Sequence, residues 1–312
     1  MSADAIRFTN VVRRFGATEA LAGLTFDVRR GEMFGLIGPD GAGKTTAIRL
    51  LCGLLHADGG DIRVLDRHPV ADHAALTARV GYLSQRFSLY GDLTVDENIE
   101  FFAEIHGVRD FARRRDQLLD MIQLTPFRRR LADRLSGGMK QKLALACTLV
   151  HQPELIVLDE PTTGVDPVSR REFWKLLSEF LAQGITILMS TPYLDEAERC
   201  ARVALLHQGR VLAADEPASL RRLIHGRMVE VMAAGVDGAA DLVRGMPGVA
   251  DTQVFGERLH VTLDGVEDGD VTRFAAALGT TRLAGAPLRG VSPTLEDVFI
   301  AKLTAKEAAS AR

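Results

Sequence analysis

The feature that most constrains this sequence is the glycine-rich run GPDGAGKTT at residues 38–46. It fits the pattern G-x-x-x-x-G-K-[ST], and an apolar stretch at 33–37 precedes it while a helical pattern from Lys44 to about Leu54 follows. Glycines let successive backbone N–H groups turn towards one anion, and a helix that begins at Lys44 directs its positive dipole end to the same point. The run therefore predicts a phosphate-binding loop between a strand and a helix.

The predicted loop combines backbone donors with two side chains that suit a nucleotide. We expect Lys44 to reach the outer phosphates and the Thr45 hydroxyl to bind a magnesium ion. The residues assigned to phosphate binding are Gly38, Pro39, Asp40, Gly41, Ala42, Gly43, Lys44, Thr45 and Thr46. Kinases, GTPases, helicases and transport ATPases all carry such a loop, so the loop alone leaves these classes open.

Two carboxylates, Asp159 and Glu160, follow the apolar run at 155–158. Side chains at the carboxyl end of a parallel strand face the crevice where ligands bind in open α/β sheets. We expect Asp159 to hold magnesium, directly or through water, and Glu160 to polarise a water aimed at the γ-phosphate. An acidic strand end before a turn is also a common surface feature, so this assignment depends on the phosphate loop.

The rest of the N-terminal part predicts an α/β fold. Strands at 6–12 and 24–28 alternate apolar and polar residues, which indicates an antiparallel β subdomain ahead of the loop. Apolar strands then alternate with helices, which predicts a mainly parallel sheet covered on both faces, as in a P-loop NTPase. The pattern between about 94 and 151 is helical.

Beyond about residue 216 the pattern of the sequence changes. Short units predict a small α+β domain of ferredoxin-like type, with a strand at 228–232, a hairpin at 254–263 that turns at Gly256 and Glu257, and helices at 239–244, 271–278 and 295–303. Leu295, Val298, Phe299 and Leu303 lie on one face of the last helix. We therefore expect two domains, residues 1–225 and 226–312, and assign the apolar stripe to core or dimer contact.

A second phosphate-binding feature is the run LSGGMKQ at residues 135–141. Ser136 is a natural helix N-cap, and Gly137 and Gly138 leave backbone N–H groups unobstructed at the helix start. Two phosphate sites in one chain make sense if two chains pair head to tail and each covers the nucleotide of the other.

With both runs present, the chain resembles the ATP-binding-cassette (ABC) ATPase family over roughly residues 3–225. The resemblance implies that Ser136, Gly137, Gly138 and Gln141 contact ATP held by the opposite subunit, and that 163–166 lies across the dimer. It also implies that Phe15 stacks on adenine, and that Gln85 senses magnesium and the attacking water and links to the membrane partner. Phe15 as plain core and Gln85 as a surface residue are the alternatives.

The segment 190–198 resembles the switch segment of the family, but Pro192 stands where the family has a histidine that hydrogen-bonds the γ-phosphate. Proline has neither a side-chain donor nor a backbone N–H. We therefore expect hydrolysis that is slower than usual or that depends on Glu160 alone.

The run VSPTLEDVFI at residues 291–300 resembles the C-terminal motif of ABC ATPases from drug, lipid and polysaccharide exporters. The resemblance implies an ATP-hydrolysing subunit that works as a homodimer or with a paired ATPase and drives an integral-membrane permease. One alternative is an ATP-binding module with weak or no hydrolysis that gates assembly. Ribosome- or DNA-directed members are disfavoured, because the chain has a single cassette and the stretch from Thr46 to Leu135 is too short for a long coiled-coil insertion.

Composition limits the partners and the location. Lys and Arg number 38 against 41 Asp and Glu, so there is no basic excess and we expect no nucleic-acid partner. The eight arginines between 109 and 134 indicate a solvated helix face with local ion pairs, or a face near the membrane.

The three cysteines are far apart, which suggests neither a disulfide framework nor a zinc site. The first ten residues contain no apolar leader and no stretch of about 18 apolar residues occurs. We therefore expect a cytoplasmic protein, held at the inner face of the membrane through the permease.

Overall fold

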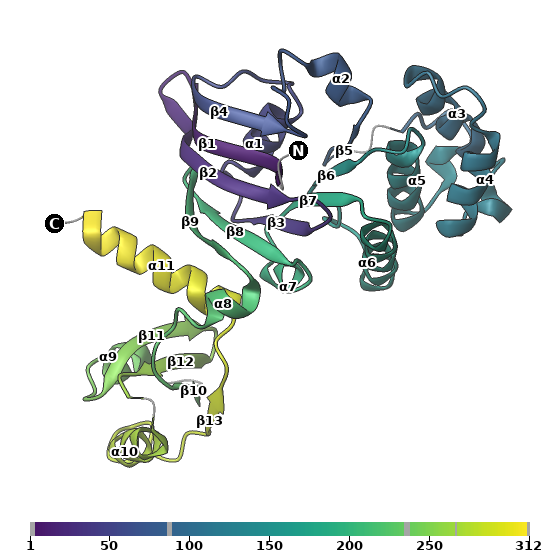
Figure 1. Ribbon diagram of the computed structural model, residues 1–312. Coiled ribbons are helices and arrows are strands. Elements are labelled where there is room, and N and C mark those ends of the chain that lie inside the picture. Colours follow the sequence, from purple (N-terminus) through teal and green to yellow (C-terminus); the bar gives the residue numbers. More distant parts are fainter. Residues whose placement is uncertain (1–3, 86–88, 234–237, 266, 311–312) are drawn as a thin grey trace. The chain divides into compact units, whose positions relative to one another are not determined.

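The computed structural model describes residues 4–85, 89–233, 238–265 and 267–310 (Figure 1). The chain divides into two compact units, Met1–Ala214 and Asp215–Arg312. This division precedes helix α8 (Pro217–Arg221), whereas the boundary drawn from the sequence follows it. In the second unit Leu220 of α8 is buried, and α8 contacts α11 (Leu295–Ser310).

An antiparallel sheet forms the N-terminal part of the first unit, with the order β2–β1–β4. Its strands are β1 (Asp4–Phe15), β2 (Thr18–Arg29) and β4 (Gly59–Val64). The β1–β2 hairpin is longer than the sequence pattern indicated and pairs Phe15 with Thr18 at its tip. Phe15 therefore lies at the end of a continuous strand.

The core sheet of the first unit has the order β5–β6–β7–β3–β8–β9. Its strands are β3 (Met33–Ile37), β5 (Val80–Leu83), β6 (Leu155–Asp159), β7 (Thr186–Thr191), β8 (Arg202–His207) and β9 (Arg210–Asp215). Neighbours from β5 to β8 run parallel, so the predicted mainly parallel sheet is confirmed. Since parallel strands end at one edge, the segments that follow β3, β6 and β7 meet there.

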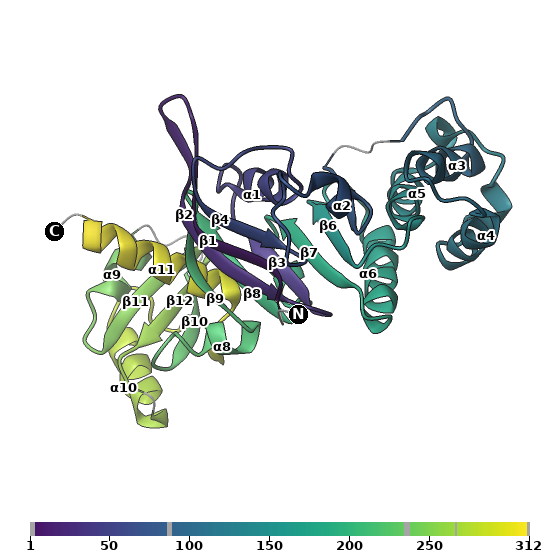
Figure 2. The same cartoon turned by 45° about the horizontal axis from the view of Figure 1, so that its top comes forward.

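Helices connect these strands. They are α1 (Lys44–Leu51), α2 (His73–Thr77), α3 (Val95–Ile105), α4 (Ala112–Met121), α5 (Gly137–Leu149), α6 (Pro167–Ala182) and α7 (Leu194–Ala197). Helix α1 contacts β6 of the core sheet as well as β2 and β4, so it packs between the two sheets. Helices α3, α4 and α5 lie together in both views (Figure 1, Figure 2).

The arginine-rich stretch shows the local ion pairs that the sequence indicated. Arg128 reaches Asp96 of α3 at 2.8 Å and Asp116 of α4 at 3.2 Å, and Arg115 lies 3.8 Å from Asp96. These pairs link α4 and the short 3-10 turn at Thr125–Phe127 to α3. Membrane proximity of this face stays a prediction.

The second unit is an α+β domain whose sheet has the order β11–β12–β10–β13, with all neighbours antiparallel. Its elements after α8 are β10 (Met228–Met232), α9 (Ala239–Arg244), β11 (Val249–Phe255), β12 (Arg258–Leu263), α10 (Asp268–Leu278), β13 (Leu288–Val291) and α11. The β-α-β-β-α-β order with β12 between β10 and β11 is the ferredoxin-like topology. Strand β13, which sequence patterning did not indicate, has only four residues.

Helix α11 is attached to this sheet near its first turn. Leu295 and Val298 are buried, as the amphipathic pattern predicted, and Asp297 is fully buried. The Asp297 carboxylate accepts hydrogen bonds from the backbone N–H and hydroxyl of Thr294 and contacts His260 Nδ1 at 2.7 Å. The helix extends to Ser310, beyond the expected end at Leu303. Within the described ranges no helix has the length and apolarity needed to span a bilayer.

Candidate nucleotide-binding site

The predicted phosphate loop connects β3 to α1 at the carboxyl edge of the core sheet. Gly43 is the N-cap of α1 and has a φ of 105°, which L side chains rarely adopt. A Cβ atom there would also lie 2.7 Å from the carbonyl oxygen of Ala20 on β2. The loop therefore needs glycine at this position both for its turn and for its packing against β2.

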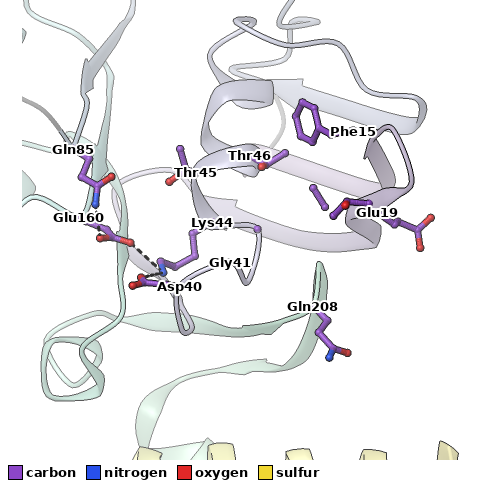
Figure 3. Close-up of a pocket in the computed structure, with 13 residues that line it drawn as sticks. Phe15, Glu19, Asp40, Gly41, Lys44, Thr45, Thr46, Gln85, Glu160 and Gln208 are labelled. Carbon is purple, nitrogen blue, oxygen red and sulfur yellow. Dashed lines mark hydrogen bonds and ion pairs between the residues drawn. The ribbon is translucent and has the colours of Figure 1, made fainter.

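Lys44 is almost fully buried and lies beneath the loop. Its ammonium group donates to the carbonyl oxygens of Gly38 and Pro39 at 2.8 and 3.1 Å, and Nζ lies 3.1 Å from Glu160 Oε1. Figure 3 shows the Lys44 side chain directed at Glu160. The positive charge of Lys44 thus lies between the loop and the end of β6.

The two carboxylates after the second apolar strand have different partners. Asp159 Oδ1 accepts from the Thr45 hydroxyl at 3.2 Å and from the Ser190 hydroxyl at 2.6 Å. Asp159 is buried, and its carboxylate lies beside the Thr45 hydroxyl oxygen. A hydroxyl and a carboxylate are the hard oxygen donors that magnesium prefers.

Glu160 contacts both the phosphate loop and Gln85. Its Oε2 accepts from Gln85 Nε2 at 3.0 Å, although the Gln85 side chain is exposed. Glu160 has a φ of 48°, unusual for a residue with a side chain, and its backbone N–H donates to the Ser190 hydroxyl at 3.0 Å. Strained backbone of this kind is often found at functional sites.

A cavity of about 600 Å³ lies over the loop. It is lined by Phe15, Thr18, Glu19, Ala20, Asp40, Gly41, Gly43, Lys44, Thr45, Thr46, Gln85, Glu160 and Gln208 (Figure 3). Phe15 is 46% exposed and borders this space, so it is not a core residue. Nine of these residues were candidates from the sequence alone. Although they are far apart in the sequence, the fold brings them together around one cavity.

Four lining residues were missed by sequence reasoning. Thr18, Glu19 and Ala20 reach the cavity because the β1–β2 hairpin returns the chain beside Phe15. Gln208 lies in the turn between β8 and β9, where the backbone of Gly209 bonds to Ala42 of the loop and to Ala22 of β2. The antiparallel strands predicted at 6–12 and 24–28 were the available signal for Thr18, Glu19 and Ala20, but their position beside the loop depends on strand pairing.

The candidates of the run 135–141 do not line this cavity. Ser136 caps α5 by accepting from the backbone N–H of Met139 at 3.3 Å, as expected of an N-cap. Ser136 and Gly137 are exposed, whereas Gly138 is buried against Ser169 of α6. Gln141 is buried and donates to the carbonyl oxygen of Pro161 in its own chain. Nucleotide contact by this run stays a prediction.

The switch segment follows β7. Pro192 comes directly after Thr191, whose hydroxyl donates to the buried Glu196 at 2.7 Å. The Thr162 hydroxyl donates to the other oxygen of Glu196 at 2.6 Å. The segment around Pro192 is therefore tied to the turn after Glu160, although Pro192 itself offers no hydrogen-bond donor.

Two groups near Asp159 stay protonated at neutral pH. Burial raises the pKa of Tyr82 to about 12, and the negative charge of Asp159 acts in the same direction. Burial and Asp159 likewise raise the pKa of the Cys52 thiol to about 12. Neither group can therefore serve as an anionic nucleophile or base near pH 7.

Fold and site together define a P-loop nucleotide-binding domain. Residues 21–163 match the family model described as ABC transporter. The chain is 40% identical over 307 residues to the probable multidrug ABC transporter ATP-binding protein YbhF of Escherichia coli (strain K12), which covers 96% of this chain and 52% of that protein. The chain thus spans about half the length of that relative.

A second relative matches along its whole length. The chain is 38% identical over 315 residues to the Nod factor export ATP-binding protein I of Burkholderia orbicola (strain AU 1054), which covers 98% of this chain and 99% of that protein. A solved ATP-binding subunit of an ABC transporter superposes with a TM-score of 0.65 at 32% identity, over 70% of this chain and 92% of that one. The chain belongs to the family of ABC transporter ATP-binding proteins.

Proposed function

We propose that this chain binds and hydrolyses ATP as the nucleotide-binding subunit of an ABC exporter. The observation that carries the proposal is the cavity in which the phosphate loop, Thr45, Gln85 and Glu160 converge. Its volume of about 600 Å³ is in the range of small-molecule sites, and the buried ammonium of Lys44 suits the outer phosphates. Export is supported by the names of the multidrug and Nod factor relatives and by the run at 291–300.

The residues of the site have distinct proposed tasks. The loop N–H groups and Lys44 hold and neutralise the phosphates, while Phe15 stacks on adenine. Glu160 accepts the proton of the attacking water, and Gln85, hydrogen-bonded to it at 3.0 Å, orients that water. Phosphoryl transfer of this kind depends mainly on positioning and charge stabilisation.

The site fits a magnesium ion. Thr45 Oγ1 and Asp159 Oδ1 lie 3.2 Å apart beside the loop, and both are oxygen donors. We assign these two residues, with Gln85 nearby, to the ion. When bound, magnesium would neutralise phosphate charge and help to orient the γ-phosphate.

The proposed working unit is a pair of cassettes with a membrane permease. The exposed Ser136 and Gly137 at the start of α5 leave backbone N–H groups available to ATP held by a second subunit. The second subunit of the pair is either another copy of this chain or a related ATPase. The permease would hold the chain at the inner face of the membrane.

The test of this proposal is ATP hydrolysis by the chain reconstituted with its permease. We expect Glu160→Gln to abolish turnover while ATP is still bound, because the amide keeps the shape of the carboxylate but cannot accept the proton. Phosphate release gives the rate, and calorimetric titration gives ATP affinity. Equal inactivity of the unchanged protein and the variant would contradict the enzymatic function.

A second candidate function is an ATP-binding module whose hydrolysis is weak or absent. Pro192 favours it, because the switch segment lacks the histidine donor that the family has at this place. In this case ATP would drive association with the partner, and the complex would persist without release of phosphate. Turnover measured with the permease present separates the two functions.

A further inference from the structure

The Phe15 ring is an exposed aromatic at the end of a strand. It is 46% exposed and borders the cavity over the phosphate loop. An exposed ring that can rotate must lose that freedom when a base stacks on it, and this loss weakens binding. A neighbour that holds the ring beforehand would therefore strengthen base binding.

Arg13 is such a neighbour. It lies two residues before Phe15 on β1, and its guanidinium carbon lies 4.7 Å from the centroid of the Phe15 ring. This geometry is a cation–π contact. Phe15 borders the cavity whereas Arg13 is not among the residues that line it, so the guanidinium covers the ring without filling the space open to a ligand.

The Arg13 side chain is itself held in place by Asp58. Arg13 Nη1 donates to Asp58 Oδ1 at 3.0 Å, and the backbone N–H of Arg14 donates to Asp58 Oδ2 at 2.6 Å. The backbone N–H of Asp58 donates to the carbonyl oxygen of Val12 at 2.8 Å. Asp58 is thus joined to β1 at three successive residues, directly before β4.

The Nε atom of Arg13 also indicates that the contact between Arg13 and the Phe15 ring is important. It is buried, and it has no hydrogen-bond partner within the part of the chain that the structure describes. Burial of an unpartnered donor has a cost. The aromatic face is the group that compensates for it here, since the guanidinium lies over that face.

We propose that Arg13, held by Asp58, is a positioning residue that presents the open face of Phe15 to the base of the nucleotide. The inference rests on the proposed binding of ATP at this site. Because the ring is ordered before ATP arrives, less conformational entropy is lost on binding. The effect is limited to ligands that have a base.

The experiment is a double-mutant cycle with two ligands. Affinities of ATP and of inorganic triphosphate, which has no base, are measured by calorimetric titration for the unchanged protein, Arg13→Ala, Phe15→Ala and the double variant. Arg13→Ala should weaken ATP about two- to fivefold, the range expected of one cation–π contact. The same change should have no effect in the Phe15→Ala background and none on triphosphate.

Three further variants complete the design. Asp58→Ala should weaken ATP in the same way as Arg13→Ala, with thermal unfolding recorded to confirm that the sheet is folded. Arg63→Ala is the matched control, since Arg63 is an exposed arginine on β4 of the same sheet that pairs with Asp61 at 3.0 Å. Lys44→Ala, which removes the phosphate contact, should weaken both ligands.

Each outcome bears on one of the two proposals. Equal losses from Arg13→Ala with and without the Phe15 ring, a loss for triphosphate, or no loss at all would overturn the positioning role while ATP binding stands. Failure of ATP to bind the unchanged protein, or full binding by Lys44→Ala, would overturn the proposed nucleotide site itself.

Discussion

Lys44 and Glu160, which are far apart in the sequence, form an ion pair of 3.1 Å at the bottom of the cavity, and both are at least nine-tenths buried. The pair joins the phosphate loop to the end of β6. Both side chains are held by further bonds, Lys44 to two loop carbonyls and Glu160 to Gln85. Both proposed catalytic groups are therefore held in place by bonds within the chain.

This pair predicts that single substitutions are not additive. Lys44→Met leaves the Glu160 carboxylate buried beside an apolar side chain, so the free energy of unfolding should fall by about 1–3 kcal/mol. Adding Glu160→Gln removes the unpaired charge and should recover part of that loss. Chemical denaturation of the two single variants and the double variant checks the cycle. Simple addition of the two single effects would show that the pair is not coupled.

Pro192→His should raise the rate of ATP hydrolysis about tenfold, because it returns a donor where charge develops on the γ-phosphate. Pro192→Ala is the matched control: it removes the ring but adds no side-chain donor, and its rate should stay at that of the unchanged protein. Steady-state phosphate release measures both. If the two variants gave the same rate, the donor would not be what the segment lacks.

The two glycines of the run at residues 135–141, Gly137 and Gly138, should respond differently to the same change. A Cβ atom at Gly138 would lie 2.5 Å from Ser169 Cβ on α6, whereas a Cβ at Gly137 meets nothing within 4 Å. Gly138→Ala should therefore lower the free energy of unfolding by about 1–3 kcal/mol through overpacking, while Gly137→Ala has little effect. Thermal and urea unfolding of both variants provide the comparison. Equal tolerance would mean that α5 moves freely away from α6.

Stability of the first unit should depend on His151. Its ring stacks on His106 with centroids 3.9 Å apart. Burial, with a smaller effect of His106, lowers the pKa of His151 from 6.5 to about 4. The unfolded chain therefore binds the proton more readily than the folded chain between about pH 6.5 and pH 4, so stability is complete above pH 6.5 and falls as the pH decreases.

Lowering the pH from 7 to 5 should lower the free energy of unfolding by roughly 1–2 kcal/mol through His151. This figure already takes account of the partial exposure of the ring. His151→Phe keeps a planar ring against His106 but cannot take up a proton. Denaturation curves at the two pH values should show a smaller acid loss for the variant than for the unchanged protein. An identical loss in both would assign the acid sensitivity to other groups.

The sequence predicted well those elements whose conformation depends on neighbouring residues in the chain, and predicted poorly those that depend on distant ones. Gly43, Lys44 and Thr45 lie within one loop, whose conformation follows from its own glycines and the helix after it, so pattern alone located them. The four-residue strands β5 and β13 gave no comparable pattern, because strands this short take their conformation from their neighbours. The early end assigned to α11 had the opposite cause, since its helical sequence continues past the last apolar residue to Ser310.

The sequence by itself determined the class of protein: the two runs at 38–46 and 135–141, with the acidic strand end at 159–160, are local signals, and their order is the family order. Only the tertiary structure decided which groups meet. It brought Gln85 to Glu160, Gln208 to the loop, and Arg13 and Asp58 to Phe15. The physical reason is that these contacts join separate strands, and their register and order follow from packing of the whole sheet rather than from any short stretch of residues.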